Sequence, residues 1–213
     1  SRSRKTPHTT DYLTSLLAVA IVIEHLGHQS FSTFDNLADK TNRSLQTLEP
    51  MCLEIGKALF KNETFYFLGA GPSFGTAQYA AAKFWEAGGL KAFAFELEEF
   101  AHGPHLLVDE GDPVFVIAPS GSCLDRARVI VEGLTEIGLT IYAITDDKTA
   151  FPDIHTLSIP PLSEAWSPFL TSLPAQWLCW AISSTKGYDV VTKDGRHPNP
   201  GVYESAHRAW VRD

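Results

Sequence analysis

The stretch that decides the fold is residues 64–76, TFYFLGAGPSFGT. Its first five residues form an apolar run of strand length, and Gly69 and Gly71 follow in a loop that extends to Gly75. Residues 76–87 then carry small and apolar side chains at helical spacing. Glycines at 88 and 89 are typical of a helix end. The stretch therefore predicts a strand, a glycine-rich loop and a helix, which together form the first unit of a parallel sheet.

The same alternation continues along the chain. Four more runs have the length and apolar character of strands: residues 91–97, 113–118, 140–145 and 155–159. Helical spacing is found at residues 9–27 and 43–60 before the first strand, and at about 123–138 and 166–186 after the third and fifth strands. We expect an α/β fold, a three-layer αβα sandwich with a five-stranded parallel sheet, preceded by two helices. Ligands of such sheets bind at the carboxyl ends of the strands.

Composition excludes several classes of protein. The 213 residues are 44% hydrophobic and 20% charged, which indicates a globular core and excludes a disordered or fibrous chain. The formal net charge of −8 argues against a nucleic-acid partner and against an anionic membrane. The most apolar run, residues 16–23, is shorter than a membrane-spanning helix, and we expect no membrane association.

The cysteines indicate a reducing compartment. Cys52, Cys123 and Cys179 are odd in number and widely spaced, in apolar contexts that favour a buried structural role. We therefore expect a cytoplasmic protein with no disulfide, no metal site and no cofactor.

Two loops are candidates for binding an anion. Around Gly71, Ser73 and Thr76, backbone amides and hydroxyls at a helix start would suit a phosphate, and the alternative is a simple capped turn. Ser120 and Ser122 follow the third strand in the same way, and plain capping is again the alternative. A dinucleotide site is a rival interpretation of the first loop, because Glu96 ends the second strand where a ribose-binding acid would lie.

Two pairs of side chains are candidates for acid–base chemistry. Lys83 and Glu86 are three residues apart on a predicted helix and therefore share a face. One interpretation is a general base, Glu86, beside an ammonium, and the alternative is a surface ion pair. A turn at His-Gly-Pro presents His102 outward beside Glu99, which suits a proton shuttle, although a single histidine is more often structural.

These motifs together resemble a sugar isomerase (SIS) domain. The resemblance runs from about residue 64 to 187, and its clearest motifs are FLGAGP at 67–72, AAKFWE at 81–86, EFAHGP at 99–104 and VDEGDPV at 108–114. The chain is most similar to the second SIS domain of double-SIS proteins. That group includes the isomerase half of glucosamine-6-phosphate synthase, glucosamine-6-phosphate deaminases and fructosamine-6-phosphate deglycases.

The resemblance implies a flavodoxin-like fold and an aldose–ketose phosphosugar isomerase or deglycase. It implies that Glu86 moves a proton between C1 and C2 of an open-chain sugar phosphate, with Lys83 beside it. It implies that His102 assists ring opening, often in a neighbouring subunit's site. The alternative is a non-catalytic module that binds a sugar phosphate or serves as a scaffold. The implied partners are a phosphorylated sugar and either a second copy of the chain or a first SIS domain.

The resemblance also suggests an organisation for the chain. Residues 1–42 would be a connecting helix from a preceding SIS domain, residues 43–190 the SIS domain, and residues 191–213 a tail near the active site. Two departures from the family pattern concern ligand binding. The stretch APSGSC at 118–123 keeps only the central Ser-Gly of the family's phosphate loop, and the tail has no lysine at the position that forms an imine in the synthase. Lys193 is the nearest lysine to it.

Overall fold

The computed structural model describes residues 9–27, 36–191 and 200–210. Its centre is a parallel five-stranded sheet with the strand order β2-β1-β3-β4-β5. The strands are β1 Thr64–Gly69, β2 Lys91–Glu96, β3 Pro113–Ile117, β4 Thr140–Thr145 and β5 His155–Ser158. This order and the parallel pairing confirm the predicted α/β fold and are those of flavodoxin-like sheets.

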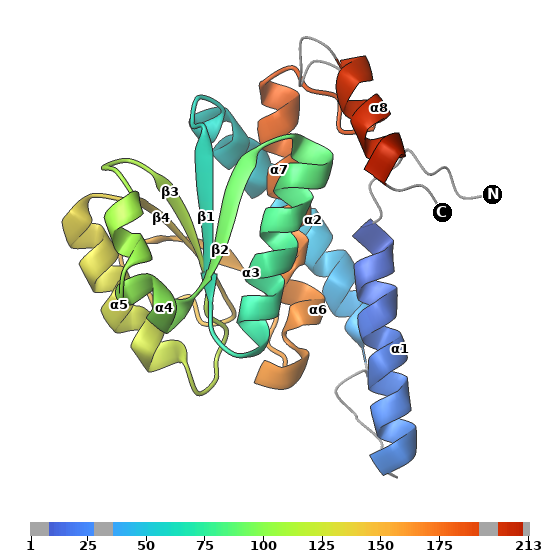
Figure 1. Ribbon diagram of the computed structural model, residues 1–213. Helices are drawn as coiled ribbons and strands as arrows, with labels where there is room; N and C mark the ends of the chain where they lie inside the picture. Colours follow the sequence, from blue (N-terminus) through green and yellow to red (C-terminus); the bar gives the residue numbers. More distant parts are fainter. Residues whose placement is uncertain (1–8, 28–35, 192–199, 211–213) are drawn as a thin grey trace.

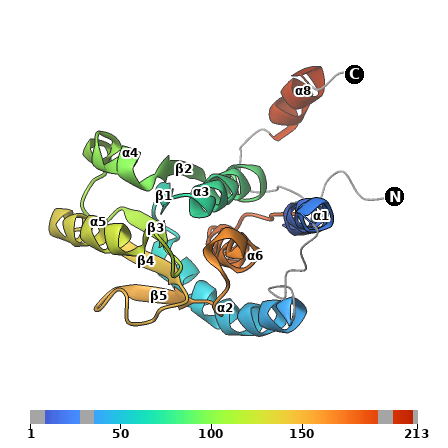
Figure 2. The same cartoon turned by 90° about the horizontal axis from the view of Figure 1, so that it is seen from below.

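Helices cover both faces of the sheet (Figures 1 and 2). Those before β2 are α1 Thr9–Gly27, α2 Leu37–Leu59, α3 Pro72–Lys83 and the π-helical turn η2 Phe84–Gly88. Those between β2 and β4 are α4 Leu97–Ala101, the 3₁₀ turn η3 Pro104–Leu107 and α5 Leu124–Ile137. The remainder are the 3₁₀ turn η4 Glu164–Trp166, α6 Pro168–Thr171, α7 Leu173–Thr185 and α8 Pro200–Trp210.

The core is split by the sheet into two layers of packed side chains. Along β1 and β3, Phe67 and Phe115 face the layer that holds α2, α3 and α7, and Leu68 and Val116 face the layer of α4 and α5. This alternation follows from the two-residue period of a strand. Because both faces of the sheet are covered, the strands are apolar on both sides, as the sequence shows.

Three helices differ in their bounds from the sequence prediction. The helix predicted over residues 43–60 is α2, which already begins at Leu37. The helix after β1 begins at Pro72 and not at Thr76, because Pro72 suits the first helical position and Gly71 turns the chain at a φ of 53°. Gly69 is required in the same turn, since a Cβ there would lie 2.5 Å from the Ser73 carbonyl oxygen. The single helix expected over 166–186 is divided into η4, α6 and α7, with Pro168 and Pro174 in the first turns of α6 and α7.

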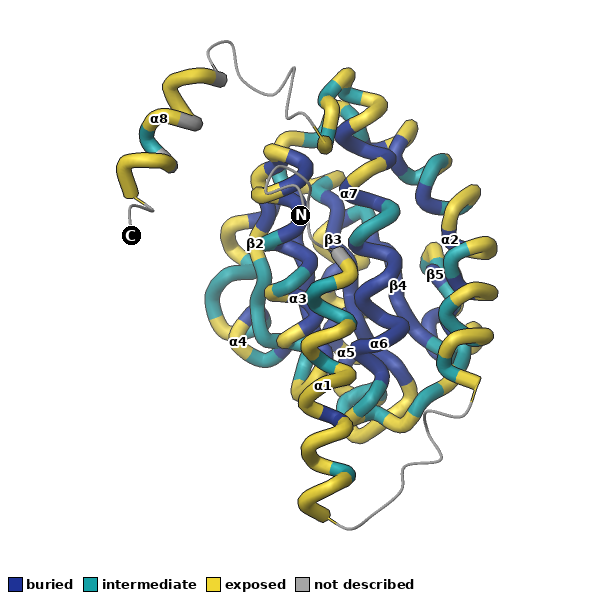
Figure 3. The backbone as a smooth tube through the Cα atoms, turned by 90° about the vertical axis from the view of Figure 1, so that its right-hand side faces the viewer, coloured by how far each residue is buried: buried dark blue, intermediate teal, exposed yellow. Residues whose placement is uncertain are grey.

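The helix α1 has the predicted bounds but buries little of its surface (Figure 3). Leu17, Val19, Ile21 and Leu26 are exposed, whereas Ala20 is buried. Residues 10–27 are long and apolar enough to cross a membrane by length and composition alone, a window longer than the run at 16–23 that the sequence prediction considered. One such helix near an N-terminus is weak evidence for a membrane span. The predicted turn at 30–35 and Lys193 lie outside the described residues.

Candidate functional site

The end of α3 brings Lys83 and Glu86 together as predicted. The Lys83 Nζ lies 3.1 Å from the Glu86 Oε1, and the two side chains are 6% and 47% exposed. Lys83 is thus buried, whereas Glu86 is half exposed. Glu86 lies in the π-helical turn η2, a geometry that occurs often at functional sites. The Trp85 indole N–H donates to the Ala92 carbonyl at 2.7 Å and fixes this turn to β2.

Three further residues were not placed beside this pair by the sequence analysis, namely Tyr79, Gln176 and Cys179. Lys83 Nζ lies 5.6 Å from the centroid of the Tyr79 ring. The Tyr79 hydroxyl accepts a hydrogen bond from the Gln176 amide at 3.1 Å, and the Cys179 thiol donates to the Lys83 carbonyl at 3.3 Å. Tyr79 precedes Lys83 by four residues and so shares its helix face, which the spacing could have revealed. Gln176 and Cys179 come from α7, nearly a hundred residues away, and local sequence carries no signal for them.

His102 lies at the end of α4 and is largely exposed. Its side chain is 80% exposed, and its Nε2 lies 3.7 Å from the Glu98 Oε2. The carboxylate that faces the imidazole is that of Glu98 and not that of Glu99, the expected neighbour. Glu99 contacts His102 through the backbone instead, where its carbonyl accepts a hydrogen bond from the His102 N–H at 3.1 Å. Glu98 also accepts two hydrogen bonds from the Arg126 guanidinium, which holds the pKa of that carboxyl below its usual range.

Glu86 and His102 occupy opposite ends of β2. Glu86 precedes the first residue of the strand, and His102 follows the last through α4 (Figure 1). A six-residue strand spans about 20 Å at roughly 3.3 Å per residue. One chain therefore does not bring these two side chains to a single small substrate.

The first predicted anion loop turns its hydroxyls inward. Ser73 and Thr76 are buried in the first turns of α3, and only Gly71 of the three predicted residues is exposed. The Thr76 hydroxyl lies 3.4 Å from that of Thr171 and is hydrogen-bonded to the Tyr12 hydroxyl. These side chains join α3 to α6 and α1, and the expectation of hydroxyls directed at a phosphate is not met.

Glu96, the acid on which the dinucleotide interpretation depends, has another role in the structure. The Glu96 carboxylate caps α4, accepting hydrogen bonds from the backbone N–H groups of Glu98 and Glu99 at 2.7 and 3.2 Å. Capping satisfies amides that a helix start leaves without partners. Glu96 is therefore engaged in the fold at the position where a ribose would need it.

The second predicted anion loop is occupied by the chain's own carboxylates. The Ser122 backbone N–H and hydroxyl both donate to the Glu164 carboxylate at 3.1 Å. The Ser120 N–H donates to Asp146 at 2.6 Å. Gly121 lets Glu164 approach, because a Cβ at that position would lie 2.4 Å from the Glu164 Cδ. These donors are therefore bonded to carboxylates of the chain itself, and the binding of a substrate anion by this loop stays a prediction.

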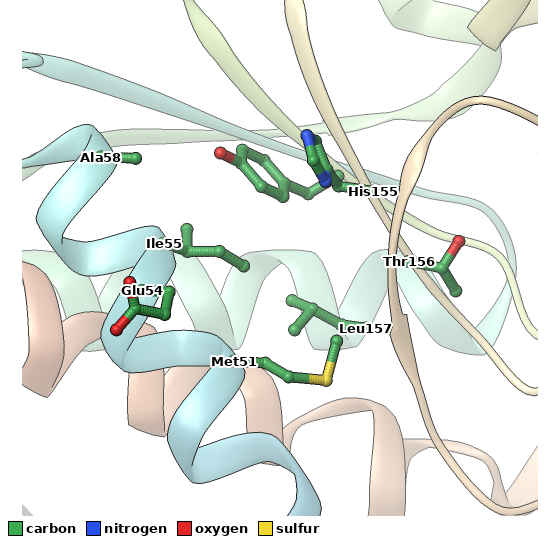
Figure 4. A pocket seen from close by; sticks show the side chains of 8 residues that line it. Met51, Glu54, Ile55, Ala58, His155, Thr156 and Leu157 are labelled. Atoms are coloured by element: carbon green, nitrogen blue, oxygen red, sulfur yellow. The ribbon is translucent and has the colours of Figure 1, made fainter.

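A separate pocket of about 430 Å³ lies at the other edge of the sheet (Figure 4). Met51 and Ile55 of α2 face His155 and Leu157 of β5 across it. Because β5 and β2 are the two edge strands, this pocket is remote from the Lys83–Glu86 pair. Within residues 9–27, 36–191 and 200–210, no three His, Cys, Asp or Glu side chains form a group suited to a metal ion.

The strand order defines an α/β protein of the flavodoxin-like type, with the Lys83–Glu86 ion pair where α3 passes into the π-helical turn η2. The chain belongs to the SIS domain family, since the model of that family matches residues 58–179, more than half of the chain. This confirms the family that the sequence motifs indicated.

Individual relatives agree with this assignment. Glutamine–fructose-6-phosphate aminotransferase (isomerizing) of Rhizobium meliloti is 32% identical over 150 residues, which are 68% of this chain and 25% of that protein. The enzyme of the same name from Escherichia coli is 30% identical over 127 residues, 58% of this chain and 21% of that one. The chain thus spans about a quarter of the length of the curated relatives it matches.

Solved structures show the same fold. The C-terminal domain of glucosamine–fructose-6-phosphate aminotransferase from Francisella tularensis superposes with a TM-score of 0.76 at 23% identity, covering 84% of this chain and 54% of that one. Glucosamine-6-phosphate deaminase from Thermotoga maritima gives a TM-score of 0.73 at 21% identity, covering 92% and 57%. These similar proteins carry the names of sugar-phosphate enzymes, and the chain shares their SIS fold.

Proposed function

We propose that this chain supplies the proton-transfer half of a phosphosugar isomerase or deglycase site, with Glu86 as the base. In this reaction the Glu86 carboxylate takes the proton from one of the adjacent carbons C1 and C2 of the open-chain sugar. The resulting enediolate then receives that proton from Glu86 at the other carbon, while the hydroxyl proton passes from one oxygen to the other, so that the carbonyl group and the hydroxyl group exchange places. A carboxylate that is half exposed and held by hydrogen bonds is able to perform both steps.

The observation that carries the proposal is the buried ammonium of Lys83 at 3.1 Å from Glu86. Burying the ammonium of a lysine carries a desolvation penalty, and attraction to a half-exposed carboxylate does not by itself offset that penalty. In the proposed site the ammonium serves the reaction, because it fixes the direction of the base and stabilises the negative charge that develops on the enediol oxygens.

His102 enters the proposal from a neighbouring molecule. It lies at the other end of β2 from Glu86, so the imidazole that opens the sugar ring at this site would come from a second copy of the chain or from a preceding SIS domain. This arrangement makes a homodimer or a double-SIS assembly part of the proposal. Two further elements of the proposal are based on the resemblance to sugar-phosphate enzymes. Residues 191–213 form a tail near the active site, and the protein is cytoplasmic.

The test is exchange of the C1 and C2 hydrogens in deuterated buffer, followed by NMR with fructose 6-phosphate, glucosamine 6-phosphate, fructosamine 6-phosphate and tagatose 6-phosphate. Glu86→Gln keeps the shape of the side chain but cannot accept the proton, and exchange should fall by roughly 10²–10⁴-fold. Glu54→Gln is the matched control, because Glu54 forms the same i,i+3 pair with Lys57 on exposed surface. Exchange that persists unchanged in Glu86→Gln would refute the role of Glu86.

A second candidate function is a non-catalytic module that binds a sugar phosphate or serves as a scaffold. The observation that favours it is the occupancy of the Ser120–Ser122 loop by Glu164 and Asp146, which leaves this loop's donors bonded within the chain. A module of this kind would be stabilised thermally by the same sugar phosphates without exchanging their C1 and C2 hydrogens. Thermal melting and hydrogen exchange with the same sugar phosphates therefore distinguish the two candidate functions.

A further inference from the structure

The ammonium of Lys83 needs a partner on its buried side. Its side chain is almost fully buried, whereas the carboxylate that it meets, Glu86, is half exposed. A buried cation that is compensated on one side only keeps much of its desolvation penalty. The group on the protein side is the ring of Tyr79, whose centroid is 5.6 Å from Nζ, within the distance at which a ring face attracts a cation.

Tyr79 is itself held from two further helices. Its ring stacks on that of Tyr12 from α1, with centroids 3.9 Å apart and planes at 17°. Its hydroxyl accepts from Gln176 of α7, and the Tyr12 hydroxyl is bonded to Thr76, one turn before Tyr79 on α3. Figure 2 shows α1 beside α3 and α6, so this contact comes from the tertiary arrangement. Burial raises the pKa of Tyr79 well above its usual value, which keeps the phenol neutral beside the ammonium.

We propose that Tyr79 is a positioning residue, whose ring face holds the Lys83 ammonium in place beside Glu86. This inference rests on the proposed function of the Lys83–Glu86 pair. Tyr79 does not take part in proton transfer. It acts through Lys83, and the stacked ring of Tyr12 keeps the Tyr79 ring in the required orientation.

The test separates the electrostatics of the ring from its shape. Tyr79→Phe keeps the ring and removes the hydroxyl, and 3,4,5-trifluorophenylalanine at the same position has nearly the same shape but a ring face that no longer attracts cations. The first readout is the rate at which an N-hydroxysuccinimide ester acylates Lys83 in the folded full chain, measured by mass spectrometry. Acylation should stay within about twofold in Tyr79→Phe and rise roughly tenfold in the trifluoro variant.

A matched control is present in the chain. Lys61 Nζ lies 5.8 Å from the Phe60 ring centroid, but Lys61 is exposed to solvent. Trifluorophenylalanine at position 60 should leave the acylation of Lys61 unchanged, because water screens an exposed pair of this type. Circular dichroism and thermal melting of each variant establish that a change at Lys83 does not come from unfolding.

The second readout is hydrogen exchange of the sugar phosphate. If the pair is the proposed base, the trifluoro variant should lower kcat by roughly tenfold with KM unchanged, and Tyr79→Phe should retain most of the activity. Equal acylation of Lys83 throughout the ring series would overturn the inference, as would a tenfold rise already in Tyr79→Phe. If the ring series behaves as expected but the unaltered protein exchanges no hydrogen, the inference stands and the proposed function of the pair fails.

Discussion

Gly56 offers a quantitative test of the packing that supports the site. It lies inside α2 and is buried against α7, where a Cβ would be 2.8 Å from both the backbone carbon and the Cβ of Ala181. Atoms of a helix backbone cannot rotate away as the end of a side chain can, so Gly56→Ala requires the two helices to separate. α7 also carries Gln176 and Cys179, and such a shift would therefore reach Tyr79 and Lys83.

Two opposing contributions decide the sign of the effect. Alanine is favoured over glycine inside a helix by about 1 kcal/mol. Overpacking a close contact costs about 1–3 kcal/mol, and a contact with backbone belongs at the upper end. We expect Gly56→Ala to lower the free energy of unfolding by about 1–2 kcal/mol. Gly133→Ala is the control, because Gly133 lies inside α5 with nothing within 4 Å of the new Cβ, and we expect it to gain about 0.5–1 kcal/mol.

Urea denaturation followed by circular dichroism measures both variants, with equal m-values as the condition for comparing midpoints. The midpoint should fall for Gly56→Ala and rise for Gly133→Ala. If both midpoints rose together, helix propensity alone would determine the outcome. The close approach of α2 and α7 would then not constrain the chain as described.

Two further predictions concern the cysteines and the loop after β3. Burial raises the pKa of Cys52 to about 12, so its contribution to stability is complete below about pH 8.5 and is lost as the pH rises towards 12. The urea midpoint should therefore fall less between pH 9 and 11 in Cys52→Ala than in the unaltered protein. Iodoacetamide at pH 8 should label half-buried Cys123 well before Cys52 in the native protein. Equal labelling of the two cysteines would contradict this. Glu164→Ala should speed hydrogen exchange of the Ser122 amide and cost about 1 kcal/mol. Gly121→Ala should have the same effects, because the new Cβ displaces the Glu164 carboxylate. The double variant should lose no more free energy of unfolding than one single variant, whereas full additivity would show that the two residues act independently.

Much of the fold was predictable from local patterns. The five strands are apolar runs of strand length separated by helical segments, and α1 and β4 have the predicted bounds. The start of α3 was placed four residues late, because glycines at 71 and 75 favour a loop, whereas Pro72 already begins the helix. The division of the last helix at Ser167 and Ser172 was within reach of the sequence, because Pro168 and Pro174 suit the first turns of helices.

The candidate site was predictable in part. The pairing of Lys83 with Glu86 follows from their spacing on a helix, and the family follows from the motifs around them. The burial of Lys83 and the π-helical turn that carries Glu86 do not follow from spacing, since both depend on neighbours in α7 and β2. The capping role of Glu96 is local and was within reach of the sequence, because an acidic residue before a short helix is a common cap.

The sequence by itself determined the α/β class, the SIS family and the pairing of Lys83 with Glu86, because each depends on residues close together along the chain. The tertiary structure decided what those residues face. In the loop after β3, the Glu164 carboxylate accepts the hydrogen bond of the Ser122 N–H. His102 lies at the opposite end of β2 from Glu86, and the ring of Tyr12 stacks on that of Tyr79. These are contacts between segments far apart in the chain, and they are set by how helices and loops pack on the sheet, which no local pattern encodes.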